Sequence, residues 1–494
     1  MPGRVSTLIS RPWSKWPKRL LRDSRKGPLR LAWKSKRKCS GRSSLARRVG
    51  GTARWTARRV PWRFAAGGSN RASQWPIAPT VVEAFSPQRP LLRLDGHGYS
   101  PALLQAIVSA GAQLPSFENA AFALSLAGLS ISARHVQELT EQVGTELTAV
   151  RDAKAQQRRQ RQLQPEVALT PQVVAAEVDG GRLRTRAGGC GRGVHEKENR
   201  EDKIACLVTL HSPLHAADPQ PEPAPSFVKP RRIQRLVQQM HRMTGSESGP
   251  QTTENPAPDE AIPTPDTEAW APRRLVRTCV ASLKNSAAFG PMMAGEAQAR
   301  DFYAAPRRAF VADGQAYNWT IHRGYFPDFV PIVDFLHVIC YLYTAAHVST
   351  RDESQRWPQY LTWLRACWQG RVADVVADLE QEQAALGRPP PGEELATNDP
   401  RRVIAEALSY VSNNAERMDY PRYRQLGLPT TSSLVESLVG EFNARVKAPN
   451  KFWNRPDGAE AILQVRAALL SEDGRLERHF ATRPGSPYRR RTAA

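Results

Sequence analysis

The nine residues "VVAAEVDGG", at positions 173–181, join an apolar run to a carboxylate and two glycines. Val and Ala fill the first four positions, which is typical of a buried β-strand. A buried strand does not normally end on an ionised side chain, because removing a carboxylate from water is costly. Asp179 therefore needs either a structural role in a turn or a chemical role at the end of the strand.

Two further acids lie at comparable positions, one at the end of a predicted strand and one near the start of a predicted helix. "RRAFVADG", residues 307–314, predicts a short strand that finishes on Asp313. "TSSLVESLVGEFNARVK" predicts a helix capped by Ser432 or Ser433, with Glu436 near its start. Each acid alone has an ordinary interpretation, as a turn residue at a strand end or as a partner of the helix dipole.

Together the three carboxylates suit metal-assisted phosphoryl transfer. That chemistry needs hard oxygen ligands on rigid elements, aimed at two Mg²⁺ or Mn²⁺ ions roughly 3.5–4 Å apart. Three carboxylates alone would repel one another, and two divalent ions offset that charge. The candidate catalytic residues and metal ligands are therefore Asp179, Asp313 and Glu436.

The positive charge of the chain is concentrated at one end. The 494 residues carry a formal net charge of +23, and residues 1–75 hold 21 Lys and Arg with one acid, Asp23. The remaining 419 residues are nearly balanced, with 49 basic and 46 acidic side chains.

Six dispersed cysteines without a Cys-x-x-Cys pair argue against a zinc ribbon or a disulfide framework. No apolar run reaches the length of a membrane span, so we expect no membrane partner.

Residues 1–80 predict a basic disordered tail, because tryptophans are scattered among the cations without helical or strand periodicity. Such a tail fits a nucleic-acid arm, a mitochondrial transit peptide, or an extension unrelated to the working fold. A short basic disordered segment is also expected at 483–494.

Residues 90–165 predict a helical region that is similar to a helix-turn-helix. Ser116 and Ser132 are expected to cap its second and third helices, and the third helix has an apolar stripe at Val136, Leu139, Val143 and Leu147. Outward residues near the start of that helix are candidates to read base edges: Arg134, His135 and Gln137. A helical bundle that makes no DNA contact fits the same pattern.

The basic stretch that follows, from Arg151, continues the helix or forms a solvated linker, and it contributes Arg158 and Arg159 as candidate DNA contacts. Beyond it, "KIACLVTL" (203–210) predicts a second strand, joined to the first by the glycine-rich "RAGGCGRG". Residues 211–272 hold 12 of the 40 prolines and predict a mostly disordered insert. Within it, "KPRRIQRLVQQMHRM" predicts an amphipathic helix that docks on the body or on DNA.

The later part of the chain predicts more helices. "FVPIVDFLHVICYLYTAAHV" predicts a buried strand running into an apolar helix, and residues 340–425 predict a helical insertion. "PDGAEAILQVRAALLS" predicts the final helix of the body.

These blocks resemble bacterial insertion-sequence DDE transposases of the ISKra type, relatives of the Mutator-like transposases. The matching stretches are "VDGGRLRTR", "EDKIACLVTL", "FVADGQAYNW", "YFPDFVPIVDFLHVICYLY", "NAERMDYPRYRQLGLPTTSSLVESLVGEFNARVK" and "FWNRPDGAEAILQVRAALLS". "YSPALLQAIVSAGAQLPSFENAAFALSLAGLSISARHVQELTEQVG" is similar to the family's DNA-binding region. The order and number of these blocks over roughly 90–482 make the resemblance specific.

The resemblance implies an α/β catalytic domain over 170–482, with an RNase H-like mixed sheet flanked by helices. It also places the family's catalytic triad on Asp179, Asp313 and Glu436. "DFLH" resembles the Asp-x-x-His pair of Mutator-like enzymes, which implies supporting roles for Asp334 and His337. Two alternatives stay open: a core histidine at 337, and a competition between Asp334 and Asp313 for the second ligand position. The family's Ser-Gly pair before the glutamate is Ser-Ser here, which predicts a weaker fit to DNA.

By the same resemblance, the chain is expected to be a DNA transposase in the bacterial cytoplasm, associated with the nucleoid. Its expected partners are double-stranded DNA, at the transposon ends and at the target, and further copies of itself on that DNA. Additional candidate phosphate contacts, which could equally be a solvated strand face or helix face, are Arg182, Arg184, Arg186, Asn443 and Lys447. The alternatives are a transposase-derived DNA-binding protein with a silent catalytic domain and an RNase H-like nuclease.

Overall fold

The computed structural model describes residues 98–186, 197–244, 270–350, 352–390, 392, 395–447 and 451–483, apart from the side chains at 197, 239–244 and 436. The predicted tail at 1–80, the glycine-rich turn at 187–196 and nearly all of the predicted C-terminal segment lie outside these residues. Within the described ranges, no helix has the length and apolar content needed to cross a membrane.

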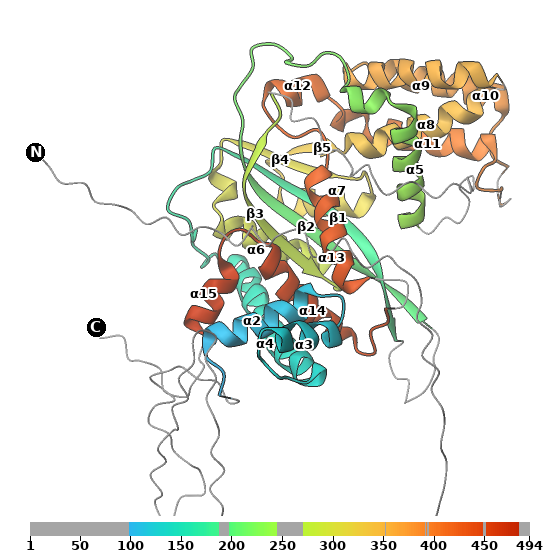
Figure 1. Ribbon diagram of the computed structural model, residues 1–494. Coiled ribbons are helices and arrows are strands. Elements are labelled where there is room, and N and C mark those ends of the chain that lie inside the picture. The colour runs from blue at the N-terminus through green and yellow to red at the C-terminus, as the bar shows by residue number, and fades with distance from the viewer. Residues whose placement is uncertain are drawn as a thin grey trace, which may run out of the picture. The chain divides into compact units, whose positions relative to one another are not determined.

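A mixed sheet of five strands forms the centre of the fold, in the order β3-β2-β1-β4-β5 (Figure 1). Its members are β1 (Val173–Arg186), β2 (Lys197–His211), β3 (Arg273–Ser282), β4 (Arg307–Ala312) and β5 (Val330–Val333). β2 runs antiparallel to both β1 and β3, whereas β4 is parallel to β1 and β5 is parallel to β4. The expected α/β class with a mixed sheet is therefore confirmed.

β1 does not end at Asp179, so the predicted strand end is wrong. Its pairing with β4 stops at Val178, but its pairing with β2 continues to Arg186. Beyond Asp179, Trp453 replaces β4 as the backbone partner of β1. Its N–H donates to Arg184 O and its carbonyl accepts from Arg186 N, each at 3.0 Å. The polar residues after Asp179 thus continue as strand because new backbone partners replace β4.

The sequence analysis missed β3 and the helix after it, α6 (Ser286–Ala299). The first residues of β3 are exposed and include Arg273 and Arg274, so they lack the apolar run that marks a buried strand. α6 contains Pro291 and several small residues, which obscure a helical pattern. A short 3-10 helix, η2 (Phe302–Ala304), links α6 to β4.

Helices cover both faces of the sheet. α13 (Ser433–Val446) contacts β1 and β2, and α14 (Pro456–Leu470) contacts β3. Side chains alternate along a strand, so Glu177, which bonds α13, points away from the face that carries Phe310. Phe310 packs on the rings of Trp319 and Phe326, at α7 (Ala316–Tyr325), and α6 packs beside α7.

The three predicted N-terminal helices are present as α2 (Pro101–Gln113), α3 (Phe117–Leu126) and α4 (Ala133–Arg159). In each case a serine hydroxyl accepts from a backbone N–H of the first turn, at Ser100, Ser116 and Ser132. Their apolar core also includes residues of α14 and of α15 (Arg475–Thr482). The sequence had predicted α14 as the final helix of the body, but α15 follows it.

The predicted helical insertion lies between β5 and α13. It consists of α8 (Phe335–Ser349), α9 (Glu353–Trp368), α10 (Val372–Leu386), α11 (Pro400–Asn414), the 3-10 helix η3 (Ala415–Arg417) and α12 (Tyr420–Gln425). Trp363, Trp368 and Tyr420 are among its largest buried side chains. The abundance of tryptophan and leucine in this part of the sequence is thus explained by burial, because these side chains belong to the same apolar core as the strands of the sheet.

The disorder predicted for 211–272 is wrong for the first half of that segment. Phe227, in the 3-10 helix η1 (Pro225–Val228), is buried against the rings of Phe335 and Trp368. Asp218 accepts from Arg424 through both of its carboxylate oxygens. α5 (Pro230–Thr244) docks on α8, with Ile233 buried, so docking on the body is the correct alternative. Aromatic and ionic anchors order a proline-rich segment here, while residues 245–269 lie outside the described ranges.

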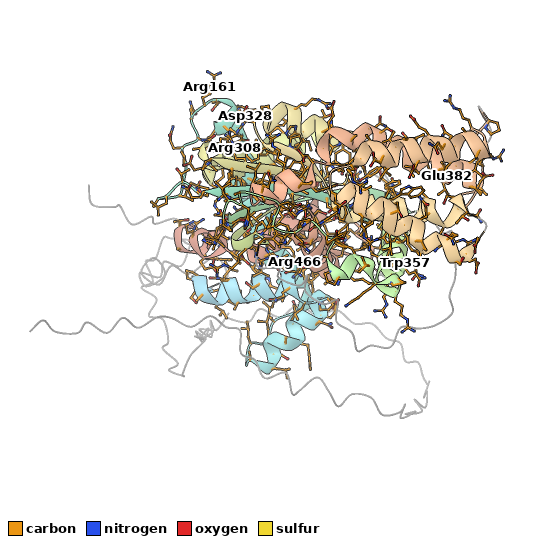
Figure 2. The ribbon with its side chains drawn as sticks, turned by 90° about the horizontal axis from the view of Figure 1, so that it is seen from above. Arg161, Arg308, Asp328, Trp357, Glu382 and Arg466 are labelled. Atoms are coloured by element: carbon orange, nitrogen blue, oxygen red, sulfur yellow. The ribbon has the colours of Figure 1, made fainter. Side chains whose placement is uncertain are left out.

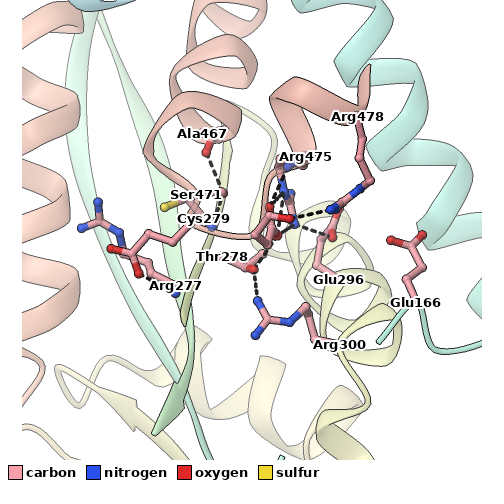
Figure 3. Close-up of polar contacts among 12 residues, drawn as sticks. Glu166, Arg277, Thr278, Cys279, Glu296, Arg300, Ala467, Ser471, Arg475 and Arg478 are labelled. Atoms are coloured by element: carbon pink, nitrogen blue, oxygen red, sulfur yellow. Dashed lines mark hydrogen bonds and ion pairs between the residues drawn. The ribbon is translucent and has the colours of Figure 1, made fainter. Parts of the chain in front are cut away.

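A buried polar network ties α15 to β3 and α6 (Figure 3). The Arg475 guanidinium bonds Asp473 and Glu296, at 2.8 and 2.9 Å, and the Thr278 hydroxyl donates to Asp473 at 2.7 Å. Burial alone would raise the pKa of Asp473, but the Arg475 charge and these hydrogen bonds lower it to about 2. The network therefore stabilises the fold only while Asp473 is ionised.

We predict that Asp473→Asn destabilises the protein at pH 7 by about 2 kcal/mol, from the shift of nearly two pKa units. The folded pKa lies below the unfolded value of about 3.9, so the contribution is complete above that value and fades as the pH falls toward 2. Urea unfolding at pH 7 and pH 3 measures both effects. Asp374→Asn, at an exposed ion pair with Arg371, is the matched control and should cost less than about 0.5 kcal/mol. An equal loss for Asp473→Asn at both pH values would contradict the prediction.

Candidate active site

Three aspartates lie where the pairing of the three parallel strands β1, β4 and β5 ends, at the C-terminal side of that pairing. The pairing of β1, β4 and β5 ends at a single row of residues, Val178, Ala312 and Val333. The next residue on each strand is an aspartate: Asp179, Asp313 and Asp334. Neighbouring strands lie about 4.8 Å apart, so this register brings the three carboxylates to one edge of the sheet.

Asp179 is an acid in an unfavourable electrostatic environment. Burial raises its pKa to about 6, and the nearby charges of Asp313 and Asp334 act in the same direction, while His337 opposes them. The carboxylate accepts a hydrogen bond from Gly180 N at 2.7 Å. Among the described residues no lysine or arginine forms an ion pair with it. A cation at this position would therefore relieve a charge that His337 and Gly180 N only partly offset.

Asp313 is held in place from two sides. Its Oδ1 accepts from Gln315 N at 3.0 Å and from Asn318 Nδ2 at 2.8 Å, at the start of α7. Its carbonyl accepts from the Tyr410 hydroxyl of α11 at 2.9 Å. Gly314 follows with φ +91°, and a Cβ there would meet Tyr410 at 2.8 Å, so the close packing requires glycine. Both side-chain bonds go to one carboxylate oxygen, which fixes the direction of the other.

Asp334 is fully buried, and both of its oxygens accept hydrogen bonds. Oδ1 accepts from Leu336 N at 3.1 Å and from Ser432 N at 2.8 Å, and Oδ2 accepts from His337 N at 3.3 Å and lies 2.6 Å from His337 Nδ1. Burial would raise its pKa, but His337 and the backbone donors hold it below the ordinary value. This geometry favours Asp334 as a structural support and Asp313 as the ligand.

His337 lies between these groups. It is in the first turn of α8, with its side chain 16% exposed, and its ring bonds Asp334. When the ring is protonated, its charge lowers the pKa of Asp179. His337 thus shares features of a bonded core histidine and of a site residue.

The start of α13 is attached to the same edge. Glu177 Oε2, fully buried in β1, accepts from Val435 N at 2.9 Å, and Ser432 N donates to Asp334. Glu436 follows Val435 in the first turn, so its backbone lies next to β1, while its side chain lies outside the described residues. Sequence reasoning missed Glu177, although a charged residue inside the apolar run of 173–178 was the available signal.

The predicted DNA contacts on α4 are partly engaged within the chain. Arg134 is exposed but pairs with Glu138 at 2.8 Å, and Gln137 donates to Glu141 at 2.7 Å. His135 is half-buried, with its ring 5.9 Å from that of Tyr99. At the far end of the helix, Arg158 lies over the ring of Tyr303 at 4.8 Å and Arg159 is exposed.

The remaining predicted contacts occupy two other surfaces. Arg182 and Arg184 are exposed and Arg186 is half-buried. Strand alternation points all three away from the face of Asp179. On α13, Asn443 is half-buried and Lys447 is exposed. Asn443 and Lys447 therefore lie at the C-terminal end of the helix that begins at the candidate site. The three arginines lie on the opposite face of the β1–β2 ribbon.

The residues present fit a divalent cation that prefers oxygen. Asp179 and Asp313 supply carboxylates without ion-pair partners among the described residues, and the raised pKa of Asp179 reflects a charge that such a cation would offset. No group of three or more acidic, histidine or cysteine side chains within the described residues has the spacing of a metal site. The third predicted ligand, Glu436, is not among those side chains.

In comparisons with known proteins, no protein-family model matches this chain, and no curated protein matches it significantly. Function is therefore argued from the residues and their geometry.

We predict that Asp179→Asn stabilises the metal-free protein by about 3 kcal/mol at pH 7.5. The folded pKa of Asp179 lies above the unfolded value of about 3.9, so its ionised form weakens the fold progressively between about pH 4 and pH 6 and fully above that. Asparagine keeps the shape and removes the charge. Unfolding in EDTA at pH 7.5 and pH 4 should show the gain only at the higher pH. A less stable variant at pH 7.5 would refute this account of the site.

Proposed function

We propose that this chain is a metal-dependent DNA transposase with an RNase H-like catalytic domain. The observation that carries the proposal is the row of aspartates at the edge of β1, β4 and β5, with the start of α13 fixed against it. The mixed sheet, in which β2 runs antiparallel to both neighbours, and the helices on both of its faces are compatible with such a domain. The resemblance of the sequence blocks to ISKra-type transposases supports the same assignment.

In this proposal Asp179 and Asp313 hold the divalent ions, and Glu436 completes the ligand set. Bound there, two such ions activate an attacking oxygen and stabilise the leaving one. Asp334 keeps the starts of α8 and α13 together and orients His337 through Nδ1. His337 then contributes positive charge beside Asp179 and the reacting phosphate.

The reaction proceeds in two chemically equivalent steps. Water attacks a phosphodiester at each transposon end, which breaks the bond to the 3′ oxygen and leaves a 3′-hydroxyl. That hydroxyl then attacks a phosphodiester of the target DNA, so that one bond forms as another breaks. Two ends must be processed together, which favours an assembly of several copies on the DNA.

DNA recognition is assigned to the helical region of α2–α4. The start of α4, where Arg134 is exposed, supplies a helix end of the kind that enters a major groove. Asn443 and Lys447 lie further along α13 from Glu436 and would contact the phosphates next to the reacting one.

We predict that Asp179→Ala, Asp313→Ala and Glu436→Ala each reduce cleavage of the element's own ends by at least about a thousandfold. Each variant removes an expected ligand, whereas binding to the terminal repeats should stay within about threefold of wild type, because recognition lies on other helices. Cleavage of end-labelled duplexes in Mg²⁺ and in Mn²⁺, together with gel-shift binding, measures both properties.

Asp334→Asn is the matched control. Asparagine still accepts at Oδ1 from Ser432 N and Leu336 N but no longer bonds His337 as a carboxylate, so cleavage should fall only partly. If this variant loses all cleavage while Asp313→Ala retains it, the second ligand is Asp334. A wild-type protein that binds its ends but cleaves nothing in either metal would instead be a transposase-derived DNA-binding protein.

A further inference from the structure

A cluster of three cations lies where α13 and α14 meet the N-terminal helices. Arg445 and Arg466 are buried, at 2% and 5% exposure, and Lys451 is half-buried beside them. Among the described residues none of the three forms an ion pair with a carboxylate. Buried charge without a partner of opposite sign is costly, so the arrangement requires an explanation.

Backbone carbonyls satisfy part of this cluster. Arg445 Nε donates to Gly111 O at 2.9 Å, and Arg466 Nη1 donates to Ala112 O at 3.2 Å, at the C-terminal end of α2 (Figure 2 labels Arg466). Lys451 Nζ donates to Arg445 O at the end of α13. The partial negative charge of a helix C-terminus is roughly half an elementary charge, so two helix ends do not balance three cations.

Donors remain unused within the cluster. Arg445 Nη2 and Arg466 Nε are buried and have no hydrogen-bond partner among the described residues. The charges of Glu441 and Glu118 act on Arg466 and Arg445, but Glu441 forms its ion pair with Arg277, at 2.9 Å, and Glu118 is exposed on α3. The cluster therefore combines excess positive charge with free N–H groups, which are the two requirements of an anion site.

The titration of these groups agrees with their mutual repulsion. Burial and, to a smaller extent, the charge of Arg466 together lower the pKa of Arg445 to about 10. Burial lowers the pKa of Lys451 to about 8, and both arginines contribute. The three cations are thus close enough to act on one another.

We propose that Arg445, Arg466 and Lys451 form a site for one phosphate group of a nucleic-acid backbone. The guanidinium groups present fixed N–H donors suited to phosphate oxygens, and Lys451 is the member open to solvent. Phe452, 41% exposed, follows Lys451 in the sequence, and Lys447, also exposed, is the residue directly after α13.

A phosphate bound there would connect the N-terminal helices to the helix that carries Glu436. Arg445 lies on α13 itself and also contacts the ring of Phe117 at the start of α3, at 4.5 Å. DNA binding at this site would therefore act on the position of α13 at the candidate active site. Anion binding stands independently, whereas DNA as the source of the phosphate rests on the proposed function.

The first test measures anion binding by the full chain. The unfolding temperature of wild type should rise by several degrees in inorganic phosphate over chloride of equal ionic strength. Lys451→Gln should lose at least half of this rise, and Lys451→Arg should restore it. Lys229→Gln, which removes one exposed lysine before α5, is the matched control and should respond as wild type does. A full phosphate response in Lys451→Gln would overturn the site.

The second test identifies the source of the phosphate. The affinity of wild type for a duplex oligonucleotide is measured against NaCl concentration, and Lys451→Gln should reduce the slope by about one. An unchanged slope together with a lost phosphate response would show a site for free phosphate and overturn the DNA source. If wild type binds no duplex at all, the proposed function fails, while the first test still decides whether the anion site exists.

Discussion

The fold depends on the buried carboxylate of Asp334. It follows β5, accepts the first N–H groups of α8, and accepts Ser432 N from a position 98 residues later in the chain. Both ends of the helical insertion are thus hydrogen-bonded to the side chain of Asp334. A backbone hydrogen bond from Phe335 N to Thr430 O, at 3.1 Å, joins the same two segments, so the buried carboxylate lies where both ends of the insertion meet the candidate site.

The same logic extends along α13. Its N-terminal end receives the oxygens of two buried acids, Glu177 through Val435 N and Asp334 through Ser432 N. At its other end, Lys451 donates to Arg445 O, and the Trp453 indole donates to Val446 O at 3.0 Å. Acids at the start and donors at the end match the helix dipole, so α13 is held in direction as well as in position. This explains how a helix distant in sequence is held against the strands.

The elements that the sequence predicted correctly share a local signal. Serine caps and an apolar stripe mark α2–α4, and short apolar runs mark the end of β4 and the whole of β5. The missed elements lack such a signal. β3 begins with exposed arginines and becomes a strand by pairing with β2, and residues 212–228 become ordered by inserting Phe227 among aromatic rings from distant helices. In both cases the stabilising partners are far away in the chain, where periodicity gives no information.

The sequence by itself determined the residue types of the candidate site, because two apolar runs and one helix start each carried an acid that their local pattern did not require. It could not rank Asp313 against Asp334, since both follow a strand. Only the tertiary structure distinguishes their environments, because Ser432 N, 98 residues later in the chain, donates to Asp334 Oδ1. The tertiary structure alone also brought Asp179 into line with the other two aspartates, since strand register is set by pairing between distant segments.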